Sequence, residues 1–134
     1  MAWTLGSATH GWIGDGEGAV ARARRAFQVS PFGPFVFFTK HMLAQGLYVS
    51  GDYKEAVAFG QQAAARNGLL TSNLRTLAAS LVATGDVEAA HDVARRVMEI
   101  EPGFRLSAFA ARTPFCRDVL RLYIPRLRAA GLPE

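Results

Sequence analysis

Histidine, acidic and cysteine side chains are the groups of this sequence that could do chemistry. Glu88, His91 and Asp92 are spaced to share one face of a helix, and imidazole and carboxylate groups arranged in this way can ligate a metal ion. A solvated helix face carries the same pattern far more often, so we expect no metal and no other cofactor. His10 and His41 lie far apart in the sequence, and no sequence motif indicates a nucleophile paired with a base. We therefore expect a protein that is not an enzyme.

The glycine-rich stretch GWIGDGEG, residues 11–18, is similar to a phosphate-binding loop in composition alone. A P-loop needs Lys followed by Ser or Thr at the helix start, and a dinucleotide-binding loop needs a preceding strand. Neither feature is present, so we interpret the stretch as a turn between helices. Cys116 is the single cysteine, which excludes an internal disulfide and a cysteine-cluster metal site and favours a reducing compartment.

Length and composition indicate one globular domain. The chain has 134 residues, of which 50% are apolar and 19% are charged, enough to bury a substantial core. No apolar run approaches the ~18 residues that cross a bilayer, so we expect no membrane association. The opening MAWTLGSATHG lacks a basic segment ahead of an apolar one and does not resemble a signal peptide. These features predict a cytoplasmic protein.

The positive charge is concentrated near the C-terminus. The formal net charge is +4, and from Gly103 onward six arginines stand against Asp118 and Glu134, which accounts for all of it. Because the arginines alternate with large apolar residues, we interpret this segment as a folded cap with a charged outer face. Such a modest charge supports only weak, salt-sensitive contact with nucleic acid, so nucleic acid is an unlikely partner.

A repeat of about 34 residues organises the rest of the chain. Gly51 and Gly85 lie 34 residues apart, and Gly14 precedes Gly51 by 37. Each is followed by Asp and then by three mostly small residues at spacings of four and three. The triplets are Ala19, Ala23 and Ala26, then Ala56, Gly60 and Ala63, then Ala90, Ala94 and Val97. Each triplet falls on one helix face and allows another helix to approach closely.

The Gly-Asp pairs predict the turns inside helical hairpins. Glycine ends the first helix because it accepts a left-handed conformation without steric cost. Aspartate then accepts hydrogen bonds from the free N–H groups of the second helix, and the stretch from Asp52 to Glu55 is similar to a capping box. Pro31, Gly68 and Pro102 are expected to end the second helices.

The sequence thus predicts an all-α fold. The expected helices are 2–13, 17–29, 35–49, 53–66, 72–83 and 87–100, a short turn near 107–112 and a last helix near 116–130. Pro125 should kink or divide the last helix. Val119, Leu120, Tyr123, Ile124 and Leu127 recur at helical spacing and should cover the third hairpin, while Arg117, Arg121 and Arg128 face water.

The period, the paired helices, the alanine stripes and the proline in EPGF resemble the tetratricopeptide repeat across roughly residues 2–102. Trp3 fits the family pattern, whereas Lys40 and Leu74 stand where the family often has Trp. The resemblance implies a right-handed α-α superhelix in one domain, residues 1–134. Its repeats would span about 1–34, 35–70 and 71–102, with a C-terminal cap at 103–134.

A narrower resemblance concerns three short segments, VSPFGPF, EPGFRLS and LRAAGLPE. They are similar to the repeat region at the C-terminal end of some bacterial class III adenylate/guanylate cyclases. This resemblance implies a non-catalytic regulatory segment, a fragment of a longer signalling protein. It does not imply cyclase activity, because the chain carries no catalytic domain.

The tetratricopeptide resemblance also implies a partner site. The first helix of each unit would line a concave groove with Thr4, Ala8, Trp12, Phe38, His41, Gln45, Tyr48, Ser72, Arg75, Ala79 and Val82. Aromatic groups with a few polar donors suit a protein or peptide segment. The lysines and asparagines with which the family clamps a C-terminal carboxylate are replaced here, so we do not expect that mode of binding.

Two other interpretations of the same surfaces are open. The groove residues can pack against a neighbouring segment of the same chain, in particular the C-terminal one. Exposed apolar helix faces can also join two copies of the chain, which would make the protein a homo-oligomerisation module.

Overall fold

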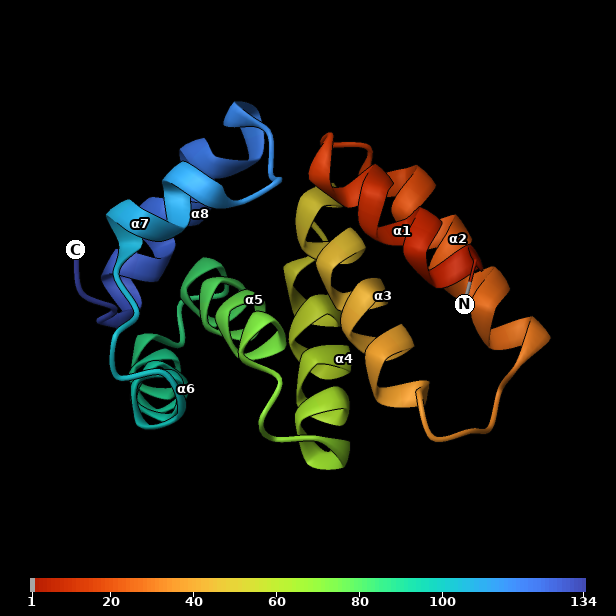
Figure 1. Cartoon of the computed structure of the whole chain (residues 1–134), viewed down its shortest axis with the longest axis horizontal. Coiled ribbons are helices and arrows are strands. Elements are labelled where there is room, and N and C mark those ends of the chain that lie inside the picture. Colours follow the sequence, from red (N-terminus) through yellow and green to blue (C-terminus); the bar gives the residue numbers. More distant parts are fainter. Residues whose placement is uncertain (1) are drawn as a thin grey trace.

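The computed structural model describes residues 2–134, and these form eight α-helices and no strand (Figure 1). The all-α prediction is confirmed. The helices are α1 (Ala2–Trp12), α2 (Gly16–Val29), α3 (Val36–Ser50), α4 (Tyr53–Arg66), α5 (Thr71–Ala83), α6 (Val87–Ile100), α7 (Leu106–Arg112) and α8 (Arg117–Ala130). Every end lies within one residue of its predicted position. None of these helices is long and apolar enough to cross a membrane.

The glycines of the three Gly-Asp pairs adopt the predicted left-handed conformation. Gly14, Gly51 and Gly85 have φ angles of 88°, 87° and 89°. At Gly51 the backbone amide donates to the carbonyls of Leu47 and Tyr48, which closes the end of α3. Any side chain at these φ angles is strained, so glycine is required here by backbone conformation.

The aspartates that follow these glycines differ in what they do. Asp15 accepts a hydrogen bond from the amide of Gly18 at 2.9 Å, and Asp86 accepts one from Ala89 at 3.2 Å. Asp52 occupies the same N-cap position of α4, but its side chain makes no capping bond. The predicted capping box at Asp52 is therefore wrong, although the helix starts where it was expected.

The small-residue triplets are packing faces, as their spacing predicts. Ala19, Ala23, Ala56, Ala90 and Val97 are fully buried, and the remaining members are nearly so. The helix backbones come close at these points. A Cβ atom added to Gly46 of α3 would lie 3.0 Å from the Cβ of Ala19 in α2, and one added to Gly60 would lie 3.3 Å from Leu77. Larger residues would push the helices apart.

The hairpins stack in chain order, with the N-terminus at one end of the array and the C-terminus at the other (Figure 1). Helix α3 packs on both α1 and α2, and α5 packs on both α3 and α4. Helix α8 packs on both α5 and α6, so it takes the place that the first helix of a further hairpin would take. The short helix α7 lies along α8.

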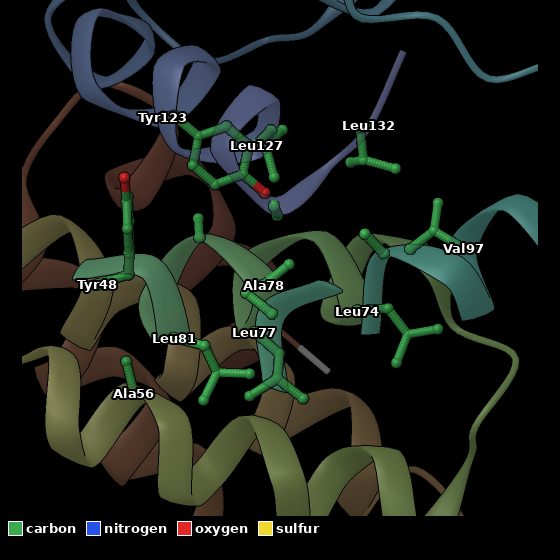
Figure 2. Close-up of a cluster of buried hydrophobic side chains, with 14 of the residues drawn as sticks. Tyr48, Ala56, Leu74, Leu77, Ala78, Leu81, Val97, Tyr123, Leu127 and Leu132 are labelled. Carbon is green, nitrogen blue, oxygen red and sulfur yellow. The ribbon is translucent and has the colours of Figure 1, made fainter. Parts of the chain in front are cut away.

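The C-terminal segment covers the third hairpin, as expected of a cap. Figure 2 shows Tyr123 and Leu127 lying over the α5 residues Leu74 and Ala78, with Leu132 beside them. Tyr123, Leu127 and Leu132 are each at most 3% exposed. The tail then folds back, and the carbonyl of Pro133 accepts a hydrogen bond of 2.8 Å from the amide of Leu106. The three arginines expected to face water, at positions 117, 121 and 128, are exposed.

Pro125 was expected to kink or divide the last helix, and the structure shows that it does not divide it. Helix α8 continues through it from Arg117 to Ala130. Proline removes one backbone donor and crowds the preceding turn. Pro125 lies on the exposed side of α8, where water can reach the unpaired carbonyl, while buried residues on both sides of it hold the two halves against α5 and α6.

The buried triplets give a stability prediction. Ala90→Leu adds three carbon atoms where the side chain is 0% exposed and should lower the free energy of unfolding by roughly 1–3 kcal/mol. Urea denaturation followed by circular dichroism measures this loss. The control is Ala58→Leu on the exposed side of α4, which should unfold like the parent. Equal stabilities of the two variants would contradict the packing role of the triplets.

Candidate functional site

One cavity of about 390 Å³ lies where the first helices of the three hairpins face the C-terminal segment. Its walls come from four parts of the chain. They are Leu5, Ala8 and Trp12 of α1; Phe38, His41, Met42 and Gln45 of α3; Ser72, Arg75 and Thr76 of α5; and Phe109, Arg112, Thr113, Pro114, Phe115 and Tyr123 of the C-terminal segment. This volume falls within the range of small-molecule and side-chain sites in proteins.

Seven of the eleven groove residues expected from the sequence line this cavity. They are Ala8, Trp12, Phe38, His41, Gln45, Ser72 and Arg75. Tyr48 and Val82 lie elsewhere. Thr4 is buried against Thr39, and Ala79 is fully buried in the core.

Tyr48 belongs to an aromatic cluster and not to the cavity. Its ring centroid lies 5.4 Å from those of both Tyr53 and Tyr123, and Arg126 donates to the hydroxyls of Tyr48 and Tyr53 at 3.1 and 3.0 Å. Burial raises the pKa of Tyr48 to about 12, against the opposing effect of its bond to Arg126. Val82 packs against the same core. At Tyr48 and Val82 the expected groove is therefore filled by packing within the chain itself.

Arg75 is held in place by aromatic rings and one carboxylate. Its guanidinium carbon lies 5.4 Å from the ring centroid of Phe104 and 5.0 Å from that of Phe109. Nη1 lies 3.8 Å from the carboxylate of Glu101, to which the hydroxyl of Thr71 also donates. The Nε atom of Arg75 is buried and has no acceptor within residues 2–134. Buried donors are normally paired in folded proteins, so Arg75 Nε is an unsatisfied donor beside the cavity.

His41 is a neutral group in this wall. It is 1% exposed, and burial, together with the positive charge of Arg75, lowers its pKa to about 3, while the nearby Asn73 side chain opposes the shift. Asn73 itself donates to the carbonyl of Gly60 at 2.9 Å, which ties α5 to α4. The imidazole thus contributes a polar surface without charge near neutral pH.

The fourth wall of the cavity comes from the chain's own C-terminal segment. The amide of Cys116 donates to the carbonyl of Trp12 at 2.7 Å, and this bond joins the end of α1 to the start of α8. Tyr123 pairs with the hydroxyl of Thr76 at 3.1 Å and lies 5.1 Å from the ring of Phe115. Sequence reasoning placed this segment as a cap and left open that it packs against the groove, but it named none of its residues as part of the site. The clustering of aromatic residues between 104 and 123 is the signal that could have identified them.

The charged groups in the cavity wall share one sign. Arg75 and Arg112 line the cavity, and no acidic residue lies among its described lining residues. Residues 2–134 also contain no group of three His, Cys, Asp or Glu side chains placed to hold a metal ion. The arrangement offers hydrogen-bond donors and positive charge beside an apolar surface, which suits the binding of a group that is partly apolar and carries hydrogen-bond acceptors.

Comparison with known proteins leaves the family open. No protein-family model matches the chain, and no curated protein matches it. The tetratricopeptide resemblance and the cyclase-like resemblance therefore stay hypotheses.

The buried imidazole makes stability depend on pH. In the unfolded chain His41 takes up a proton near its ordinary pKa of 6.5, whereas in the folded chain it stays neutral down to about pH 3. The stability that it contributes is present above pH 6.5 and is lost as the pH falls, at up to about 1.4 kcal/mol per pH unit. Between pH 6.5 and 5, urea denaturation of the parent should show this loss and His41→Gln should lack it.

The matched control is His91→Gln, an exposed histidine on α6. This variant keeps His41 and should therefore keep the loss of stability between pH 6.5 and 5. If the parent and His41→Gln lost stability equally as the pH falls, His41 would have the same pKa in the folded and unfolded states, which would contradict the prediction.

Proposed function

We propose that the chain is a non-catalytic helical-repeat module that binds a segment of a partner protein between α1, α3 and α5. The observation that carries this proposal is the cavity on the first-helix side of the stack, with apolar walls and a buried arginine whose Nε has no acceptor within the described chain. A few fixed polar groups in an apolar hollow are what peptide-binding grooves use to anchor one side chain.

The repeat pattern and the stacking support a tetratricopeptide-like architecture for this module. In that architecture, successive hairpins at residues 1–34, 35–70 and 71–102 wind into a right-handed superhelix, and residues 103–134 form the cap. The resemblance of VSPFGPF, EPGFRLS and LRAAGLPE to bacterial cyclase repeats supports a regulatory role in a larger cytoplasmic signalling protein.

Phage-displayed peptides selected on the protein test the proposal. Leu5 lines the cavity and is 56% exposed, so Leu5→Asp should leave the fold intact and weaken the selected peptides by roughly ten-fold or more, as expected for a group at a binding hot spot. The control is Leu122→Asp on α8, which is 52% exposed and lies outside this cavity. If the selected peptides bind Leu5→Asp as tightly as the parent, the partner site lies elsewhere on the protein.

Self-association is the second candidate, and an exposed apolar patch favours it. Val29, Phe32 and Phe35 at the α2–α3 turn are 62%, 89% and 59% exposed, and Trp3 of α1 is 41% exposed. Phe35 and Trp3 border one hollow. Apolar groups gathered in this way often mark interaction surfaces.

If this patch joins two copies, the parent should sediment as a concentration-dependent dimer and Phe32→Ser should sediment as a monomer. Leu69→Ser, 74% exposed at the α4–α5 turn, is the control and should behave like the parent. A monomeric parent at all concentrations would exclude this candidate.

A further inference from the structure

We propose that the cavity between α1, α3, α5 and residues 109–115 binds a small apolar carboxylic acid, with Arg75 as the group that recognises the carboxylate. The inference rests on the proposed function in using the same cavity, and it adds a ligand that would compete with the partner segment. It follows from charge, from the geometry of the guanidinium and from the way in which the cavity is closed.

The charge of the cavity wall favours an anion. Arg75 and Arg112 are the charged residues among its described lining, and His41 is neutral near pH 7 because burial lowers its pKa. Glu101 is the nearest acid to Arg75, but it stands outside the lining and its side chain is 37% exposed. A cavity with low-dielectric walls and one sign of charge concentrates ligands of the opposite sign.

The chain's own groups occupy one end of the Arg75 guanidinium. Glu101 and Thr71 both approach Nη1, at 3.8 and 3.4 Å. Arg75 also lines the cavity, and its buried Nε has no acceptor in residues 2–134. The parallel N–H groups of Nε and Nη2 in a guanidinium match the two oxygens of a carboxylate, so a carboxylate that reaches this edge would satisfy the unpaired donor.

The position of Arg75 is fixed before any ligand arrives. Its side chain is 14% exposed and lies against the rings of Phe104 and Phe109. Arginine rotamers are numerous, so holding one of them in place removes an entropic cost that a ligand would otherwise meet. The same rings leave the charge poorly hydrated, which strengthens its interaction with an anion.

The rest of the wall fits an apolar body of limited size. Leu5, Ala8, Phe38 and Met42 face the cavity from α1 and α3. The bond from the Cys116 amide to the Trp12 carbonyl joins two walls of the cavity, and the loop before Cys116 closes one of its sides. Because this side is blocked by the chain itself, the cavity admits a compact molecule or one side chain of a partner segment, and no polypeptide can run through it.

A titration with 3-phenylpropionate tests the inference, with 3-phenylpropanamide as the neutral analogue of the same shape. In ¹H–¹⁵N NMR spectra of the full chain, the acid should shift the Nε–H signal of Arg75 and the amide of Gln45, and should leave Phe32 unchanged. The amide analogue should bind roughly ten-fold more weakly or worse, because it cannot form the charged pair. Arg75→Gln should remove the preference for the acid, while Arg121→Gln, an exposed arginine on α8, should keep it.

The shift of the Arg75 signal in the parent protein keeps the test decisive even if Arg75→Gln fails to fold. Three results would overturn the inference. They are equal binding of the acid and the amide, signal shifts confined to another surface, and no binding at about 10 mM acid, a concentration that nearly saturates a site with a Kd of about 1 mM. A further arm uses the tripeptide Gly-Gly-Phe, which carries the same group at a chain end. Binding of the tripeptide without binding of the free acid would also overturn it, yet would leave the proposed partner site standing.

Discussion

Close approach of helix backbones at small residues is the constraint on which this structure depends. At the α2–α3 crossing, Gly46 lies so near Ala19 that even a single added carbon would meet it at 3.0 Å. The fully buried Ala56 and Ala90 occupy the corresponding places in α4 and α6. Short interaxial distances let each first helix touch two preceding helices at once, and this double contact sets the direction in which the hairpins stack.

The cavity is a consequence of how that stacking ends. Helix α8 fills the place of a next first helix, but α7 precedes it where a regular hairpin would have none. The chain must therefore cross from α7 to α8 on the side of α1, α3 and α5, where Cys116 bonds to Trp12. This crossing leaves a hollow over Arg75 and His41. The cap and the site are thus made by the same residues.

Local signals explain how much of the fold the sequence predicted. The left-handed glycines at 14, 51 and 85 and the spacing of the alanines are properties of a few neighbouring residues, so helix ends could be predicted within one residue. The missing cap at Asp52 depends on a side-chain rotamer, which composition does not specify. The continuity of α8 through Pro125 depends on burial against α5 and α6, a tertiary effect.

The candidate site was predicted in part for the same reason. Helical periodicity identified which residues of α1, α3 and α5 share a face, and seven of the eleven named ones line the cavity. The exclusion of Tyr48 depends on Tyr123 and Arg126, which come from a segment far along the chain. No spacing rule links these residues, so only the folded structure could show that the chain fills that end of its own groove.

The bond between Cys116 and Trp12 changes how the array should come apart. In a linear stack of repeats each unit touches its neighbours alone, and the terminal hairpins fray independently. Here the start of α8 meets the end of α1, and the side chains of Cys116 and Val119 lie beside Gly14. The stack is therefore not purely linear, because one hydrogen bond ties the start of α8 to the end of α1, and we expect loosening of either helix to disturb the other.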